Sequence, residues 1–166
     1  MTKRLIAFAA CGVAPFLAAA AMAAEAPSAT PGPQVVRGKY LVQTSGCNDC
    51  HTPGYLETEG NVEESRWLTG TALGWHGPWG TTYAPNLRLT VKDMTAEQFM
   101  ARARGPLRPP MPFFNLRAMR DGDLKAIYAY IKFLGPAGDP APAYLPPDKT
   151  PTGPFVTFPA PPPARK

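Results

Sequence analysis

The chain has 166 residues, with 17 lysines and arginines against 12 aspartates and glutamates, so its formal net charge is +5 at pH 7. This length fits one small domain. The basic residues form no dense cluster, which argues against nucleic-acid binding. No hydrolytic triad, phosphate-binding loop or pair of catalytic carboxylates stands out, and the glutamates between residues 57 and 64 form a solvated acidic patch. The modest positive charge favours solubility and would also suit docking on an acidic partner.

The N-terminus has the layout of an export signal. Lys3 and Arg4 precede an almost wholly apolar stretch over residues 5–21, and a cleavage site of small residues follows at 21–23. This predicts a secretory signal peptide over residues 1–23, whose removal lowers the net charge to +3 because two basic residues leave. A retained membrane anchor and a lipoprotein cleavage at Cys11 are the alternatives. Residues 24–33 then form a flexible linker.

The first predicted helix covers residues 34–44, where apolar residues recur at helical spacing and Gly46 follows. Gly38 lies inside this helix, where glycine costs up to about 1 kcal/mol relative to alanine. A close crossing with the last helix would explain the glycine. A weak helix is the alternative.

The sequence CNDCH at residues 47–51 follows directly. C-x-x-C-H is the attachment signature of c-type haem, in which Cys47 and Cys50 form thioether bonds and His51 is the proximal iron ligand. The same cysteines could form a thioredoxin-like pair, but no βαβ context surrounds them. A zinc site is a second alternative, although only His76 would remain as a fourth ligand and the compact finger spacing is missing. A disulfide is the third.

Residues 52–94 are rich in glycine and show little periodicity. A structureless loop of this length is unusual inside a compact domain. A haem would supply a rigid apolar surface for the loop to wrap, and we expect the segment to be largely unfolded without it. The residues available to pack on a haem are Trp67, Leu68, Trp75, Trp79, Tyr83 and Leu87.

Two further helices are predicted. Thr95 and Gln98 form a capping box that opens a helix ending near residue 104, before a Gly-Pro pair. Residues 121–134 carry apolar side chains on one helical face, and Asp121 can cap that helix.

Met111 is the candidate for the sixth iron ligand. It lies between Pro110 and Pro112, which keep the backbone extended and could hold a thioether at a set distance from iron. Methionine ligation raises the reduction potential of a haem. His76 is the alternative distal ligand. The remaining candidates are interpreted as core residues: Met94, Met100 and Met119.

Residues 136–166 form a proline-rich C-terminal extension, with eleven of the 22 prolines of the chain. This density excludes a helix or a central strand and predicts an extended, polyproline-like segment. Aromatic and aliphatic residues recur between Tyr144 and Phe158, so we expect this part to lie as a strap over the domain. The alternative is an arm that binds a partner.

Residues 34–135 resemble the class I, mitochondrial-type mono-haem cytochromes c of bacteria. The resemblance rests on the order helix, C-x-x-C-H, long loop, Met-Pro and terminal helix. It implies an all-α cytochrome c fold, with three or more helices around one covalently attached haem c. The proline-rich strap departs from the family pattern.

Local motifs sharpen the resemblance. In CHTP at residues 50–53, the resemblance implies that the Pro53 carbonyl accepts the proton on the second ring nitrogen of His51. YAPNL at 83–87 is similar to a segment in cytochrome subunits of periplasmic dehydrogenases, where such residues line the haem propionates. Those subunits often carry three haems, whereas this chain has one motif. The expected haem-binding residues are therefore Cys47, Cys50, His51, Pro53, Trp79, Tyr83, Asn86 and Met111, with His51 and Met111 on the iron.

These features together predict a periplasmic electron carrier between a dehydrogenase or membrane complex and an acceptor. It would have redox proteins as partners, no substrate of its own, and contact with a membrane surface only through those partners. A haem enzyme such as a peroxidase, or a gas or redox sensor, would need an open sixth iron position. An accessory subunit of an enzyme complex would use the C-terminal extension as a docking arm.

Overall fold

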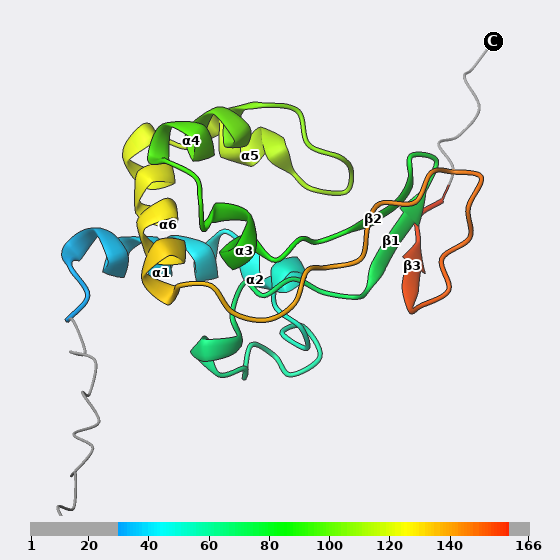
Figure 1. Cartoon of the computed structure of the whole chain (residues 1–166), viewed down its shortest axis with the longest axis horizontal. Coiled ribbons are helices and arrows are strands. Elements are labelled where there is room, and N and C mark those ends of the chain that lie inside the picture. The colour runs from blue at the N-terminus through cyan, green and yellow to red at the C-terminus, as the bar shows by residue number, and fades with distance from the viewer. Residues whose placement is uncertain (1–29, 160–166) are drawn as a thin grey trace, which may run out of the picture.

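The computed structural model describes residues 30–159. The predicted signal peptide, Cys11, most of the predicted linker and residues 160–166 lie outside this range. Figure 1 shows the helices gathered at one end and a small sheet at the other. The elements are, in chain order, α1 (Pro33–Thr44), α2 (Cys47–His51), the 3-10 helix η1 (Glu64–Arg66), β1 (Gly74–Gly77), β2 (Gly80–Tyr83), α3 (Leu87–Val91), α4 (Ala96–Arg104), α5 (Phe113–Ala118), α6 (Asp121–Leu134) and β3 (Phe155–Thr157).

The sheet corrects the prediction of an all-α fold. Its strand order is β2-β1-β3, with β1 antiparallel to β2 and parallel to β3. Strand β3 comes from the C-terminal extension and occupies an edge, where a proline-rich chain can still pair. The six α-helices of the described residues are therefore accompanied by a strand pairing that joins residues 81 positions apart in the sequence.

Helices α1 and α6 cross at Gly38, which confirms the predicted close crossing (Figure 1). A Cβ atom at Gly38 would lie 2.0 Å from the Ala126 carbonyl oxygen and 2.7 Å from Tyr130 Cβ. No side chain fits at such a distance, so the glycine allows the two backbones to touch.

The hydrophobic core lies beside this crossing. It contains Val42, Val91, Ile127, Tyr130 and Ile131 together with two residues of the long loop, Trp67 and Leu68. Trp67 and Leu68 are 5% and 0% exposed, and Trp67 meets the Tyr130 ring edge-on, with ring centroids 6.5 Å apart. Both residues, named from the sequence as available to pack on a haem, are thus part of the protein core.

The helix ends follow the sequence closely. In α4, Thr95 Oγ1 accepts from the Gln98 amide at 3.2 Å and Gln98 Oε1 accepts from the Thr95 amide at 2.9 Å, which confirms the capping box. In α6 the N-cap is Arg120, so the expected cap at Asp121 is wrong. The Asp121 carboxylate instead accepts a hydrogen bond from Arg104 at 2.7 Å, which ties α6 to α4.

The segment 52–94 contains more structure than predicted. Besides η1, β1 and β2, it forms α3, whose N-cap Asn86 accepts a hydrogen bond from the Leu89 amide at 3.1 Å. Asn86 is a favourable N-cap residue. The helix was missed because five residues are too few to show a 3.6-residue period.

Candidate haem-binding site

The motif CNDCH forms the short helix α2, directly after α1. Gly46 makes the turn between them with φ of 70°, a left-handed conformation that glycine adopts readily. Cys47 and Cys50 are both free and half-buried, and they lie three residues apart on one helical turn. Residues at this spacing share a helix face, so both thiols can reach one edge of a planar cofactor.

His51 ends this helix and is 6% exposed. Its Nδ1 lies 2.8 Å from the carbonyl oxygen of Pro85. Because a carbonyl can only accept, Nδ1 carries the proton and donates, and Nε2 keeps its lone pair. Burial lowers the pKa of His51, against the opposing effect of the Pro85 hydrogen bond. The imidazole is therefore neutral and oriented, as a metal ligand must be.

The partner of Nδ1 corrects one prediction. The Pro53 carbonyl was expected in this role, but the structure places the Pro85 carbonyl there. Pro53 lines a surface hollow of about 310 Å³ with residues 69–72 and 138–142. Pro85, two residues after the end of β2, brings its carbonyl to the His51 ring. Pro85 lies in the YAPNL motif at residues 83–87, but from the sequence the motif was not assigned the role of binding the His51 proton.

A buried layer of polar contacts supports α2. Thr52 Oγ1 donates to Asn48 Oδ1 at 2.8 Å and accepts from the Leu68 amide at 2.9 Å. The His51 carbonyl accepts from the Gly70 amide at 2.7 Å. These bonds hold the motif against the segment 68–70 and fix the direction of the imidazole.

Both cysteines have raised pKa values. Burial, and next the Asp49 carboxylate, raise the pKa of the Cys47 thiol to about 11. The same two causes raise the pKa of Cys50. Redox-active C-x-x-C pairs have lowered pKa values instead, so the environment argues against a thioredoxin-like pair. Within residues 30–159, no group of three or more His, Cys, Asp or Glu residues is arranged to hold a metal ion.

Three other predicted site residues lie in the β1–β2 hairpin or just after it: Trp79, Tyr83 and Asn86. Trp79 is at the turn of the hairpin, where its ring packs on Phe158 with centroids 5.3 Å apart. Tyr83 ends β2, and Asn86, three residues later, is 3% exposed. Tyr83 and Asn86 thus flank Pro85, close in sequence to the acceptor of the His51 proton.

Met111 lies in the loop between α4 and α5 and is half-buried. Its amide donates to the Arg108 carbonyl at 3.2 Å and its carbonyl accepts from the Phe113 amide at 2.8 Å. Its role as iron ligand stays a prediction. The alternative ligand His76 is half-buried in β1, where its Nδ1 lies 2.8 Å from Thr81 Oγ1.

Two buried polar atoms of the hairpin were not anticipated as site groups. Trp75 Nε1 and Thr82 Oγ1 have no hydrogen-bond partner among the described residues, and the two residues are cross-strand neighbours. Buried polar groups are normally hydrogen-bonded. Haem carries two propionate carboxylates, which are acceptors of the kind that both atoms could use. The free thiols, the oriented imidazole and these two donors together fit a covalently attached haem.

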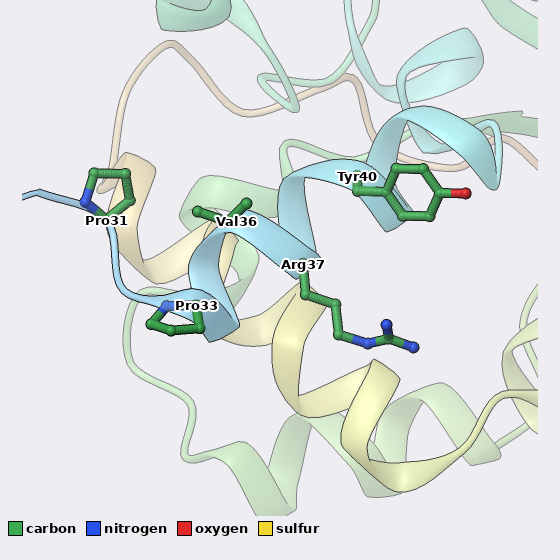
Figure 2. Close-up of a pocket in the computed structure, with 5 residues that line it drawn as sticks. All are labelled: Pro31, Pro33, Val36, Arg37 and Tyr40. Atoms are coloured by element: carbon green, nitrogen blue, oxygen red, sulfur yellow. The ribbon is translucent and has the colours of Figure 1, made fainter.

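A second surface hollow lies away from this site. It has a volume of about 580 Å³ and is lined by Pro31, Pro33, Val36, Arg37 and Tyr40 along α1 and the chain leading into it (Figure 2). None of these residues belongs to the C-x-x-C-H motif or to its supporting contacts. The hollow is therefore separate from the candidate haem-binding site.

Comparison with known proteins identifies the class. A sequence model of the cytochrome c family matches residues 35–135, more than half of the chain. The chain therefore belongs to the cytochrome c family, which confirms the predicted resemblance. As a member of that family it holds haem c covalently and is an electron-carrier cytochrome.

One related protein is a cytochrome subunit of a dehydrogenase. The chain is 28% identical over 116 residues to the fructose dehydrogenase cytochrome subunit of Gluconobacter japonicus, a match that covers 63% of this chain and 22% of the relative. The chain thus spans about a fifth of the length of that subunit. No solved structure matches the chain. Among the described residues, none of the helices has the length and apolar character needed to cross a membrane.

Proposed function

We propose that this cytochrome carries single electrons in the periplasm, between a dehydrogenase or membrane complex and an acceptor, with His51 and Met111 as the ligands of its haem iron. It performs no substrate chemistry of its own. The observation that carries the proposal is the buried His51, whose Nδ1 donates to the Pro85 carbonyl while Nε2 stays free.

Each residue of the proposed haem site would have its own role. Cys47 and Cys50 would hold the haem by thioether bonds, and His51 would be its proximal ligand. Haem iron supplies reversible one-electron oxidation and reduction when bound. The Pro85 carbonyl fixes the tautomer of the His51 ring, so the ring does not reorient when the charge on the site changes. A site that stays fixed in this way needs little reorganisation during electron transfer.

The partners and the location rest on other features. The relative is a cytochrome subunit of a dehydrogenase by name, which supports a dehydrogenase as one redox partner. The export signal predicted at residues 1–23, and the attachment of c-type haem outside the cytoplasmic membrane, support the periplasm. Fractionation of cells with haem staining tests the location, since haem-stained protein confined to the cytoplasm would contradict it.

The decisive experiment is the optical spectrum of the ferric full-length holoprotein. Ligation by Met111 predicts a weak far-red sulfur-to-iron charge-transfer band that disappears in Met111→Ala. Met100→Leu is the matched control, because Met100 is half-buried in α4 and a Met-to-Leu change is well tolerated in a packed site. A high-spin spectrum without the band in the unmodified protein would mean an open iron, and an enzyme or sensor would then explain the site better.

A further inference from the structure

We propose that the C-terminal segment over residues 136–158 is a wall of the haem pocket, joining the His51 side to the Met111 loop, with Tyr144 and Arg108 as the residues that position that loop. The proposal rests on the proposed function where it involves ligation by Met111. Three sets of contacts carry it.

The segment begins beside the acceptor of the His51 proton. Asn86 Nδ2 donates to the carbonyl oxygens of Ala137 at 2.8 Å and Asp139 at 3.1 Å. Arg88 donates to the carbonyls of Leu134 and Gly135, at the end of α6. Since Asn86 follows Pro85 directly, the start of the segment is fixed to the same turn of chain that orients His51.

The middle of the segment is joined to the hairpin. Leu145 and Thr81 exchange two backbone hydrogen bonds, of 2.8 and 3.0 Å. Next to them, Gly80 has φ of 95°, and a Cβ atom there would lie 2.2 Å from the Leu145 carbonyl oxygen. Tyr144 donates its hydroxyl proton to the Trp79 carbonyl at 2.7 Å. The Tyr144 ring is therefore held in one place against the hairpin.

The third contact reaches the Met111 loop. The Arg108 guanidinium carbon lies 4.2 Å from the centroid of the Tyr144 ring, a cation–π contact. Arg108 is three residues before Met111, and its carbonyl accepts the Met111 amide proton. Figure 1 shows the loop between α4 and α5 extending toward this segment. The fixed Tyr144 ring thus restrains the loop that carries the predicted sixth ligand.

The consequence concerns exchange of that ligand. A loop released from Tyr144 lets Met111 leave the iron more often, so an external ligand gains access. Imidazole binding to the ferric full-length holoprotein, followed by loss of the far-red band, measures this access. We expect Tyr144→Leu and Arg108→Gln each to strengthen imidazole binding about threefold, the equivalent of one cation–π contact at an exposed site.

Conservative variants separate the contacts. Tyr144→Phe keeps the ring under Arg108, so its effect should be smaller than that of Tyr144→Leu, and Arg108→Lys should restore part of the Arg108→Gln change. In the double variant, Arg108→Gln should add little to Tyr144→Leu, because both remove one shared contact. Lys149→Gln, an exposed change in the same segment, should leave binding unchanged. Unchanged single variants, or fully additive effects, overturn the proposal.

A second measurement does not depend on the iron. Hydrogen exchange at Leu107, Arg108, Met111 and Phe113, the residues of this loop that carry a backbone amide proton, should accelerate about threefold in the Tyr144→Leu holoprotein and remain near wild type in Lys149→Gln. Equal exchange in both variants overturns the pocket-wall proposal even where Met111 is a ligand. A missing far-red band in the wild type, with exchange accelerated as expected, rejects ligation by Met111 and leaves the wall in place.

Discussion

Two regions of this cytochrome are held together by different forces. The helix crossing, formed by α1 and α6, buries Val42, Leu124 and Tyr130 completely. The sheet region, formed by β1, β2 and the C-terminal segment, leaves Phe155 and Val156 of β3 each 41% exposed. Its strands are joined mainly by backbone hydrogen bonds. The helix crossing should therefore be sensitive to added atoms, and the sheet region to backbone conformation and to the haem.

Loss of the haem should separate the two regions most strongly. In Cys47→Ala/Cys50→Ala, which removes the covalent attachment, we expect amides at 74–83 to exchange at least about tenfold faster than in the holoprotein. Amides of α6 should keep more of their protection because their packing is within the protein. Hydrogen exchange with mass spectrometry measures both regions at once. Asp49→Asn, which leaves both thiols in place, is the control, and equal loss of protection in both regions would contradict the comparison.

Gly38→Ala should cause the largest loss of global stability among single changes. The new Cβ would lie 2.0 Å from the Ala126 carbonyl oxygen, and backbone cannot move aside as a flexible side chain can. We expect the free energy of unfolding to fall by about 3 kcal/mol in denaturant titration. Gly122→Ala, where a Cβ meets nothing within 4 Å in the same pair of helices, should cause no loss. Equal stability of the two variants would show that the helices can separate without cost.

Gly80→Ala should act on the sheet region instead. A side chain there is strained by the φ of 95° and would meet the Leu145 carbonyl oxygen at 2.2 Å. We expect a local cost of about 1–3 kcal/mol, seen as faster exchange of the Thr81 and Leu145 amides with α6 unaffected. Gly153→Ala, with open space around the Cβ, is the matched control. Cooperative unfolding of both regions in Gly80→Ala would argue against their independence.

The smallest expected effect on stability concerns Glu64. Its carboxylate accepts hydrogen bonds from the Lys39 ammonium group and the Tyr130 hydroxyl. Burial raises the pKa of Glu64, but the hydrogen bonds from Lys39 and Tyr130 outweigh it, so the folded-state pKa lies below that of a free glutamate. Its stabilising effect is therefore present above the unfolded-state pKa and is lost as the pH falls through the folded-state pKa. Because the side chain is 38% exposed, we expect only about 0.5 kcal/mol.

Glu64→Gln tests that effect. The difference in unfolding free energy between wild type and variant should be present at neutral pH and shrink as the solution is acidified below the pKa of a free glutamate. Denaturant titrations at several pH values measure it. Glu57→Gln, in the same acidic loop, is the matched control variant. A difference that stays constant with pH would assign the loss to packing rather than to charge.

Local sequence signals predicted α1, α4 and α6, whereas the short helices α3 and α5 were not predicted. The capping box at Thr95 and Gln98 fixes the start of α4, and Gly38 indicated the crossing of α1 with α6. The C-x-x-C-H motif predicted the haem, because its spacing is a property of neighbouring residues alone. Each of these signals depends on contacts within one turn or on the periodicity of one helix face.

Contacts between distant segments could not be predicted in the same way. Strand β1 pairs with β3 in the register Gly74 with Phe155, and no alternation in a three-residue strand signals such a partner. The acceptor of the His51 proton is a backbone carbonyl, which every residue has, so sequence cannot distinguish Pro85 from Pro53. The place of Trp67 and Leu68 in the core could not be predicted either, because apolar side chains do not specify which apolar surface they cover.

The span from Asp139 to Tyr144 sets the distance between two fixed points of the structure. Its two ends are fixed by Asn86 and by the Trp79 carbonyl, and prolines at 140 and 142 stiffen the chain between them. An extended polyproline-type chain rises about 3.1 Å per residue, so these five steps cover about 15 Å. One inserted residue would displace the Tyr144 ring by about 3 Å. The number of residues in this span is thus constrained more tightly than their identity, and length variation is better accommodated elsewhere in the chain.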